Sequence, residues 1–340
     1  MAEKIRLTLA CWTYDRTIPL YDGTVRPEGL ELTFLPLWIQ EIFYRMLKYR
    51  EFDVAELSFG AYVASLFEDS PFMAIPVFPS RSFRHDSIYV NVNSGIKEPQ
   101  DLVGKKVGVP EYRQTAAVWI RGILSDYYDV RPETVTYYTG PLEDPSRRRR
   151  YFTVLAETDV LPRYKSIKIV KIPEGKNLSD MLANGEIDAI YSALIPSSFR
   201  NYPERIARLF KNYKELEIEY YTRSKIFPIM HVVVMRRNLY ENNRWIAKSL
   251  YKAFEEAKNI AFEKFITQEL WDFETIHYAL PWLFDHYEDT VKVMGDDYWP
   301  YGLKKNYHVI ETFVRYMYEQ GLIPNIIKPE ELFAKETIDT

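Results

Sequence analysis

Two of the strands that the sequence predicts each end in a pair of polar residues. Glu56 and Ser58 end one buried strand, and Tyr191 and Ser192 end another. A carboxylate in this position can serve as a general base or orient a histidine, and hydroxyl groups beside it can hydrogen-bond a ligand. Because ligands of open α/β sheets bind outside the carboxyl ends of the strands, these residues are the first candidates for a cleft.

The elements that carry these residues form a repeated phrase. Residues 46–58 reappear in register as residues 181–193, with one Met, one Leu, one Glu and one Asp identical. Each copy reads as a helix end, a tight turn and a buried strand, and Gly185 suits the end of the second helix. Two copies in a chain of 340 residues predict two similar α/β lobes that face each other across a cleft.

The pattern after the second copy turns from strand to helix. A dense β-type run at Ile226–Met235 is followed by three helical stretches, Trp245–Phe262, Phe273–His286 and Tyr307–Gln320. We therefore predict that residues 1–93 and 232–340 form a discontinuous first lobe with a helical tail, and that residues 94–231 form an inserted second lobe. The two crossing strands would make a hinge, and hinged lobes close on ligands placed between them.

Composition narrows the class of protein. Hydrophobic residues make up 47% of the chain and charged residues 27%, as in an ordinary globular protein. The net charge of −4 gives no reason to expect nucleic acid or an anionic membrane as a partner. We interpret the basic run Arg147–Arg150 as a solvated or oligomer-contact loop rather than a nucleic-acid site. A homo-oligomer is therefore one of the expected possibilities.

Cysteine content and apolar runs bear on location. The lone Cys11 excludes an intramolecular disulfide and a CxxC metal site, and we expect it to be a small buried side chain. No apolar run approaches membrane-spanning length. The N-terminus moves directly into a strand pattern without the features of a signal peptide, so we expect a cytoplasmic protein.

Seven stretches carry a resemblance to a known family. They are LACWTYDRT (residues 9–17), FDVAELS (52–58), IPVFPSRSFRH (75–85), VGVPEY (107–112), TAAVWIRG (115–122), FPIMH (227–231) and MGDDYWPYG (294–302). With them the chain resembles the 4,5-dihydroxyphthalate decarboxylase family over almost its whole length. The resemblance implies a fold similar to the type 2 periplasmic binding proteins and a decarboxylase acting on a hydroxylated aromatic dicarboxylate.

A substrate of this kind presents two adjacent carboxylates, which arginine binds through two parallel hydrogen bonds. Arg16 follows the first strand, and Arg81 and Arg84 lie in the loop after the predicted strand Phe72–Phe78. We expect these three arginines to line the cleft, because strand-end loops carry the ligand-binding residues of such folds. The alternative for each is a surface or structural arginine.

The segment Pro110–Thr115 offers a second way to bind an anion. A strand ends at Pro110 and a helix begins within a few residues, so free backbone N–H groups can bind a carboxylate there. Glu111, Tyr112 and Thr115 therefore join Ser58 among the substrate-binding candidates. A capped helix start without a ligand is the alternative.

A second aromatic group of candidates lies near the C-terminus. Trp299 and Tyr301 are expected to form part of the cleft wall. The preceding pair, Asp296 and Asp297, is interpreted as a solvated turn.

Decarboxylation of a hydroxyarene requires electron density from a hydroxyl para to the departing carboxylate, and a proton for the ring carbon. Histidine is the obvious proton donor. We expect His85 or His231 to deliver the proton, with His85 the first choice because it shares a loop with two candidate arginines. Glu56 is the candidate base or orienting carboxylate. The other histidines have weaker support: His277, His286 and His308.

Two alternatives to this function remain. We expect no cofactor, and the alternative is a divalent metal held by His85, His231 and Glu56. The rival function is a solute-binding protein for a small carboxylate ligand, without catalysis, because fold alone does not separate a receptor from an enzyme. A synthase on the same scaffold would need a cofactor or sacrificial-residue motif, which the sequence does not show.

Overall fold

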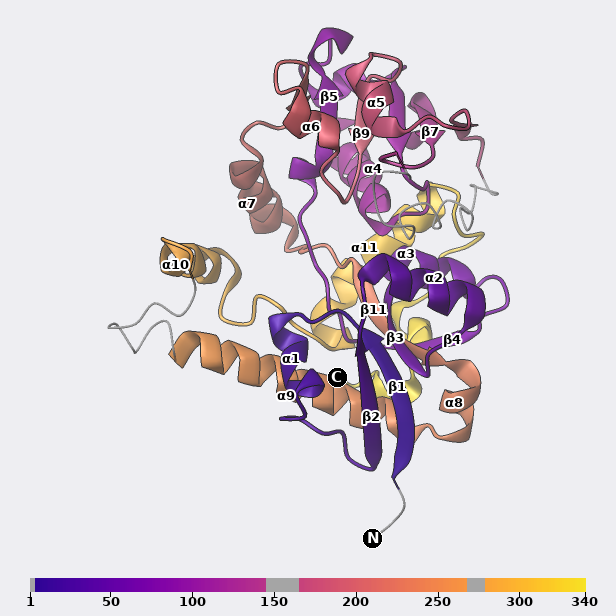
Figure 1. Ribbon diagram of the computed structural model, residues 1–340, viewed down its shortest axis with the longest axis vertical. Coiled ribbons are helices and arrows are strands. Elements are labelled where there is room, and N and C mark those ends of the chain that lie inside the picture. The colour runs from indigo at the N-terminus through magenta and orange to yellow at the C-terminus, as the bar shows by residue number, and fades with distance from the viewer. Residues whose placement is uncertain (1–3, 145–164, 268–278) are drawn as a thin grey trace.

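The computed structural model describes residues 4–144, 165–267 and 279–340, and it confirms a two-lobed α/β fold (Figure 1). The first lobe holds a five-stranded sheet in the order β2 (Leu30–Pro36), β1 (Ile5–Cys11), β3 (Val54–Ser58), β11 (His231–Arg236) and β4 (Phe72–Ile75). The second holds a six-stranded sheet in the order β10 (Ile206–Arg208), β5 (Ile88–Asn91), β9 (Ala189–Tyr191), β6 (Lys106–Val109), β7 (Thr136–Thr139) and β8 (Lys168–Lys171). The basic run Arg147–Arg150, which we predicted to be a loop, and the candidate His277 lie outside the described residues.

Each sheet contains one copy of the repeated phrase, as predicted. β3 pairs in parallel with β1, and β9 pairs in parallel with β6. The Asp shared by the two copies makes the same contact in both lobes. Asp53 Oδ2 accepts a hydrogen bond from the Thr8 N–H at 2.8 Å, and Asp188 Oδ2 accepts one from the Lys106 N–H at 2.8 Å. This identity therefore reflects one structural device, a carboxylate before the strand that ties it to its parallel neighbour.

The chain crosses between the lobes twice. β4 is the last strand of the first sheet before the crossing, and β5 already pairs with β9 and β10 in the second sheet. The predicted division after residue 93 is thus one strand too late, because the apolar run of β5 does not reveal the sheet to which it belongs. The return crossing ends at β11, which begins at His231 beside the other predicted boundary.

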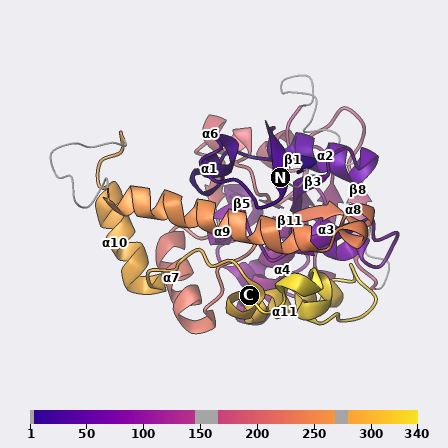
Figure 2. The same cartoon turned by 90° about the horizontal axis from the view of Figure 1, so that it is seen from below.

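Helices cover the sheets and form the C-terminal region. Their bounds are α1 (Ile18–Tyr21), α2 (Ile39–Tyr49), α3 (Phe59–Ser65), α4 (Thr115–Tyr128), α5 (Leu178–Ala183), α6 (Ser197–Asn201), α7 (Tyr213–Ser224), α8 (Arg237–Asn242), α9 (Trp245–Ile266), α10 (Leu283–Met294) and α11 (Leu303–Glu319). The long helix α9 runs across the base of the first lobe, and α10 lies beside α7 (Figure 2). Among the described helices, none has the length and apolar character that a membrane crossing requires.

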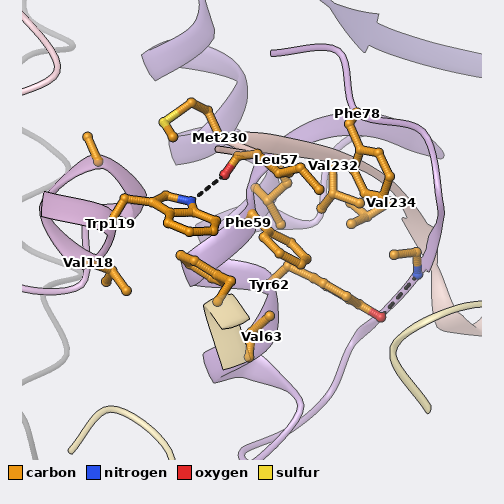
Figure 3. Close-up of a cluster of buried hydrophobic side chains, with 14 of the residues drawn as sticks. Leu57, Phe59, Tyr62, Val63, Phe78, Val118, Trp119, Met230, Val232 and Val234 are labelled. Atoms are coloured by element: carbon orange, nitrogen blue, oxygen red, sulfur yellow. Dashed lines mark hydrogen bonds between the residues drawn. The ribbon is translucent and has the colours of Figure 1, made fainter. Parts of the chain in front are cut away.

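One large hydrophobic core contains residues of both lobes. Trp119 on α4 packs against Phe313 on α11 at a ring distance of 5.2 Å, and Phe313 stacks on Phe59 of α3 at 4.8 Å. The Trp119 indole N–H also donates a hydrogen bond to the Ile229 carbonyl at 2.8 Å, just before β11 (Figure 3). The lobes therefore share a packed interior in addition to the crossing strands on which the hinge prediction was based.

Helices α4 and α11 pack closely against each other at Gly122. A Cβ atom added to Gly122 would lie 2.1 Å from Cδ2 of Tyr316, well inside contact distance. The Tyr316 hydroxyl in turn donates a hydrogen bond to Asp126 Oδ2 at 2.7 Å. The absence of a side chain at Gly122 thus sets the spacing between the second lobe and the C-terminal helix.

Candidate active site

A cavity of about 250 Å³ lies between the lobes. Ile39, Phe43 and Leu47 on α2 form one apolar wall, because residues four apart lie on the same face of a helix. The polar side chains that line the cavity come from both lobes and from the crossing segments: Gln40, Ser58, Ser80, Arg84, Glu111, Arg113, Gln114, Thr115, Glu143, Ser192 and His231. The cleft predicted between two α/β lobes is therefore present.

Strand geometry brings Glu56, Ser58 and His231 together. Glu56 and Ser58 lie on the same face of β3, because side chains two residues apart on a strand point the same way. β11 runs antiparallel to β3 and pairs His231 directly with Ser58. His231 Nδ1 consequently lies 2.6 Å from Glu56 Oε1, while the histidine also lines the cavity.

Glu56 is fully buried and surrounded by hydrogen-bond donors. Its carboxylate accepts hydrogen bonds from the Tyr14 hydroxyl at 2.6 Å and the Trp12 N–H at 3.1 Å, and the Cys11 thiol lies at 3.5 Å. Burial opposes ionisation, but the hydrogen bonds from His231, Tyr14 and Trp12 outweigh it and hold the pKa of Glu56 below its ordinary value. Glu56 is thus an acceptor only.

An acceptor-only carboxylate fixes the histidine tautomer. The hydrogen bond to Glu56 requires the proton of His231 on Nδ1 and leaves Nε2 as the ring nitrogen available to the cavity. The rings of Phe43 and His231 pack edge to face, with 4.9 Å between their centres. Orientation by Glu56 and packing by Phe43 together hold His231 in a defined position for proton transfer.

The N-terminus of α4 opens onto the same part of the cavity. Thr115, the first residue of α4, lies with its hydroxyl 2.9 Å from the Ser58 hydroxyl and accepts a hydrogen bond from the Gly60 N–H at 2.9 Å. No side chain caps this helix, so its first N–H groups remain available to an anion. We call the region formed by Ser58, Arg84, Thr115 and His231 the polar end of the cavity.

Arg84 is the one of the three predicted clamp arginines that lines the cavity. Its guanidinium is held by the Met230 sulfur at 3.2 Å and the Ser87 hydroxyl at 3.4 Å, which are weak partners for a cation. Burial lowers the pKa of Arg84 to about 10, still well above neutral pH. Arg84 therefore brings a positive charge to the cavity, next to the side chain of Met230.

Arg16 and Arg81 were also predicted to line the cleft, but neither lines the cavity. Arg16 donates hydrogen bonds to the Pro79 carbonyl and lies between the rings of Tyr14 and Trp299, at 4.2 and 4.1 Å. Arg81 donates to the carbonyls of Phe227 and Pro300 and to the Asn306 amide, and so joins its own loop to the return crossing and to the C-terminal region. Backbone carbonyls, the Asp15 carboxylate and the Asn306 amide therefore take up the hydrogen-bond donors of these two arginines.

His85 also lies outside the cavity lining, although it was the first choice for the proton donor. Its ring packs against Phe210 and Tyr220, and its Nδ1 lies 4.0 Å from Glu217. Burial lowers the pKa of His85 to about 4, so the ring is neutral at physiological pH. The alternative metal site of His85, His231 and Glu56 is not assembled, and within the described ranges no cluster of three such ligands occurs.

The remaining aromatic candidates belong to the core. Tyr112 is buried under Arg121 and donates a hydrogen bond to the Gln320 carbonyl at 3.3 Å. The Trp299 indole donates to the Phe78 carbonyl at 2.9 Å, and Tyr301 is buried with Lys258 over its ring. Their side chains pack into the first lobe or the junction between lobes rather than lining the cavity.

Several lining residues were not predicted. Arg113 follows Glu111 in the loop before α4, and Glu143 lies in the loop after β7. Both stand in strand-end loops of the second sheet, which is the same signal that identified Glu56 and Ser58. Ser192, Glu111 and Thr115 line the cavity as expected, whereas His286 and His308 do not.

No protein-family model matches the chain. The chain is 36% identical to a 4,5-dihydroxyphthalate decarboxylase of Comamonas testosteroni, over 99% of both chains. It is also 36% identical to a 4,5-dihydroxyphthalate decarboxylase of Pseudomonas putida, over 62% of this chain and 79% of the relative.

Solved structures support the fold. The periplasmic aliphatic sulphonate binding protein SsuA from Escherichia coli superposes with a TM-score of 0.50, covering 99% of this chain and all of that one. At 11% sequence identity this likeness concerns the fold alone. Near-complete alignment at 36% identity, together with the binding-protein fold, shows that the chain belongs to the 4,5-dihydroxyphthalate decarboxylase family.

Proposed function

We propose that this protein decarboxylates a hydroxylated aromatic dicarboxylate, 4,5-dihydroxyphthalate or a close analogue, to give carbon dioxide and, from that substrate, protocatechuate. The observation that carries the proposal is the pair of His231 and Glu56, whose free ring nitrogen is available to the cavity. The relatives with 36% identity bear the name of this activity.

The polar end of the cavity suits the carboxylates of such a substrate. Arg84 supplies a positive charge, and the uncapped start of α4 supplies backbone N–H donors. The hydroxyl groups of Ser58 and Thr115 lie between them and can add hydrogen bonds. Phe43 and the other α2 side chains provide an apolar wall against which an aromatic ring can pack.

His231 is the proposed proton donor. In its protonated form, Nε2–H gives its proton to the ring carbon that bears the departing carboxylate. The bond from that carbon to the carboxylate then breaks, carbon dioxide leaves, and its electron pair restores the aromatic ring. Glu56 stabilises the positive charge on His231 before the transfer and keeps the ring oriented.

A solute-binding protein is the rival function. Its support is the likeness of the fold to a binding protein at 11% sequence identity. A receptor needs the arginine and the helix N-terminus, but it has no use for a histidine held by a buried carboxylate. The Glu56–His231 pair therefore favours the enzyme.

The test is to mix the purified protein with 4,5-dihydroxyphthalate and to follow carbon dioxide and protocatechuate. His231→Asn should lower turnover by about 10²–10⁴-fold while ligand affinity changes little. His85→Asn is the matched control and should retain turnover, because His85 lies outside the cavity lining. Tight binding of the ligand by a parent protein that releases no carbon dioxide would favour the receptor instead.

A further inference from the structure

The proposed reaction needs a second proton-transfer group in addition to His231. A phenolic hydroxyl has an ordinary pKa of about 10 and keeps its proton at neutral pH. Once His231 protonates the ring carbon, that hydroxyl becomes strongly acidic and must release its proton for the ring to stay neutral. Because the hydroxyl is para to the reacting carbon, the acceptor must face the end of the ring opposite the polar end.

Two carboxylates line the cavity among the described residues, Glu111 and Glu143. Glu56 does not qualify, because it is fully buried behind His231 and already accepts several hydrogen bonds. Glu111 lies in the short loop between β6 and α4, three residues before the Gln114 that precedes the helix. It therefore belongs beside the anion-binding helix start rather than at the hydroxyl end of a substrate.

Glu143 lies in a different strand-end loop of the second sheet, the one after β7. It follows Leu142, which packs in a small hydrophobic cluster within the second lobe, separate from the large core that includes Ala116 and Ala117 of α4. The loop that carries Glu143 extends from β7, on the side of the six-stranded sheet. Glu143 thus lines the cavity from the second lobe, whereas His231 lines it from β11 of the first lobe.

The carboxylate of Glu143 is oriented from one side. Oε1 accepts a hydrogen bond from the Ser197 N–H at 2.6 Å, and Oε2 accepts one from the Ser197 hydroxyl at 2.5 Å. A carboxylate can accept about four hydrogen bonds, so acceptor capacity remains. Within the described part of the chain, no lysine or arginine forms an ion pair with Glu143. The Glu143 carboxylate is thus held in place by Ser197, and its negative charge is not neutralised by an ion pair with any of these described residues.

We propose that Glu143 is the general base that receives the proton of the ring hydroxyl, an assignment that rests on the proposed decarboxylation. The O–H bond breaks toward Glu143 as His231 Nε2–H protonates the ring carbon, which yields a neutral dienone that still carries the carboxylate. Loss of carbon dioxide returns an electron pair to the ring and leaves a phenolate. The phenolate recovers its proton from Glu143, and solvent reprotonates His231, so one proton is consumed for each carbon dioxide released.

The kinetic test compares Glu143→Gln with the parent. The variant keeps the size of the side chain and should lower kcat by about 10²–10⁴-fold with little change in KM. The loss should shrink on a ring-fluorinated substrate, because a more acidic hydroxyl depends less on a base. Asn177→Ala controls for folding: Asn177 caps α5 in the same lobe by accepting the Asp180 N–H at 2.9 Å and lies outside the cavity lining. Parental kcat in Glu143→Gln, or the same signature in Glu111→Gln instead, would overturn the assignment.

A binding test separates this assignment from the function itself. In the His231→Asn background, which prevents turnover, calorimetry would compare 4,5-dihydroxyphthalate with phthalate, which lacks the hydroxyls. Adding Glu143→Ala should weaken binding of the hydroxylated ligand by roughly 10-fold or more and leave phthalate binding nearly unchanged. Equal weakening of both ligands would remove Glu143 from the hydroxyl end, whether or not the parent protein decarboxylates.

Discussion

The hydroxyl oxygens of Ser58 and Thr115 lie 2.9 Å apart, and one belongs to each lobe. Ser58 ends the strand that carries Glu56, and Thr115 begins the helix whose N–H groups open onto the cavity. This contact brings the proton-transfer pair of the first lobe next to the anion-binding element of the second. The polar end of the cavity is therefore defined by the junction between the lobes.

Loss of the Thr115 hydroxyl should destabilise this junction. Thr115→Val removes the acceptor of the buried Gly60 N–H and the partner of Ser58, so the free energy of unfolding should fall by about 1–3 kcal/mol. Thr115→Ser retains the hydroxyl and should recover most of that stability. Urea denaturation of the two variants and the parent measures the effect. Equal stability of the Val and Ser variants would show that the hydroxyl contributes nothing.

Removal of the Glu56 charge should reduce turnover without preventing folding. In Glu56→Gln the amide oxygen can still accept the Nδ1–H of His231, but it no longer stabilises a protonated ring. We expect kcat to fall about 10²-fold or more while KM stays similar. Tyr14→Phe removes one donor to Glu56 and should have a smaller effect on kcat. A Tyr14→Phe loss larger than that of Glu56→Gln would contradict this order.

Arg84 and Arg81 should differ in what their loss affects. Arg84→Lys keeps the charge but loses the planar fork, and it should weaken ligand binding by about 1–3 kcal/mol if two hydrogen bonds are made. Arg81→Lys should lower stability and leave the affinity of the folded protein nearly unchanged, because Arg81 binds the carbonyls of Phe227 and Pro300. Calorimetry and thermal denaturation of both variants separate the two roles. The reverse pattern would restore Arg81 as the clamp.

A methyl group at Gly122 should force α4 and α11 apart. Gly122→Ala places a Cβ against the ring of Tyr316, and overpacking of this kind costs about 1–3 kcal/mol, partly offset by the higher helix propensity of alanine. Adding Tyr316→Leu should relieve the clash, so the two effects on stability should not be additive. Simple additivity in a double-mutant cycle would mean that the two side chains do not meet.

His85 and Glu217 should give stability two opposing pH dependences. Burial lowers the pKa of His85 to about 4, so its contribution to stability is lost as pH falls from about 6.5 to 4. Burial, with the charge of Asp86, raises the pKa of Glu217 to about 7, so its contribution is lost as pH rises from about 4.5 to 7. The two slopes cancel over most of the window between these values.

Removing either His85 or Glu217 should reveal how the free energy of unfolding depends on pH through the group that remains. Relative to the parent, the free energy of unfolding of Glu217→Gln should rise with pH between about 4.5 and 7, and that of His85→Asn should fall between about 4 and 6.5. Urea titrations at a series of pH values give both differences. Parallel curves for the parent and either variant would show that the altered group titrates normally in the folded protein.

Elements with a strong hydrophobic period were predictable from the sequence. The helices predicted at Trp245–Phe262 and Tyr307–Gln320 are present as α9 and α11, because a helical stripe of apolar residues marks each of them clearly. Helix α7 was not predicted. Tyr220 is its only buried residue, so no apolar stripe distinguishes this helix from a solvated loop.

The candidate site was partly predictable for the same reason. Strand ends identify Glu56 and Ser58, and His231 is predicted from its place in the second crossing strand. The fold brings the three residues together. Arg81 and Arg84 could not be separated, since they are three residues apart in one irregular loop. Their directions depend on the backbone path: Arg81 forms a bridge with Ile229, whereas Arg84 directly precedes a short helical turn at His85–Ser87. Side-chain direction in a loop is a property of tertiary contacts rather than of a sequence period.

The shared core of Trp119, Phe313 and Tyr316 has a thermodynamic consequence for ligand recognition. The two lobes that form the cavity walls share this core, so the distance between the walls is fixed when the chain folds. Little conformational entropy is then lost when a ligand binds. Substitutions that loosen this interior, far from any contact with substrate, should then appear first as weaker affinity. The junction of α4 with α11 is in this sense a determinant of binding as much as of stability.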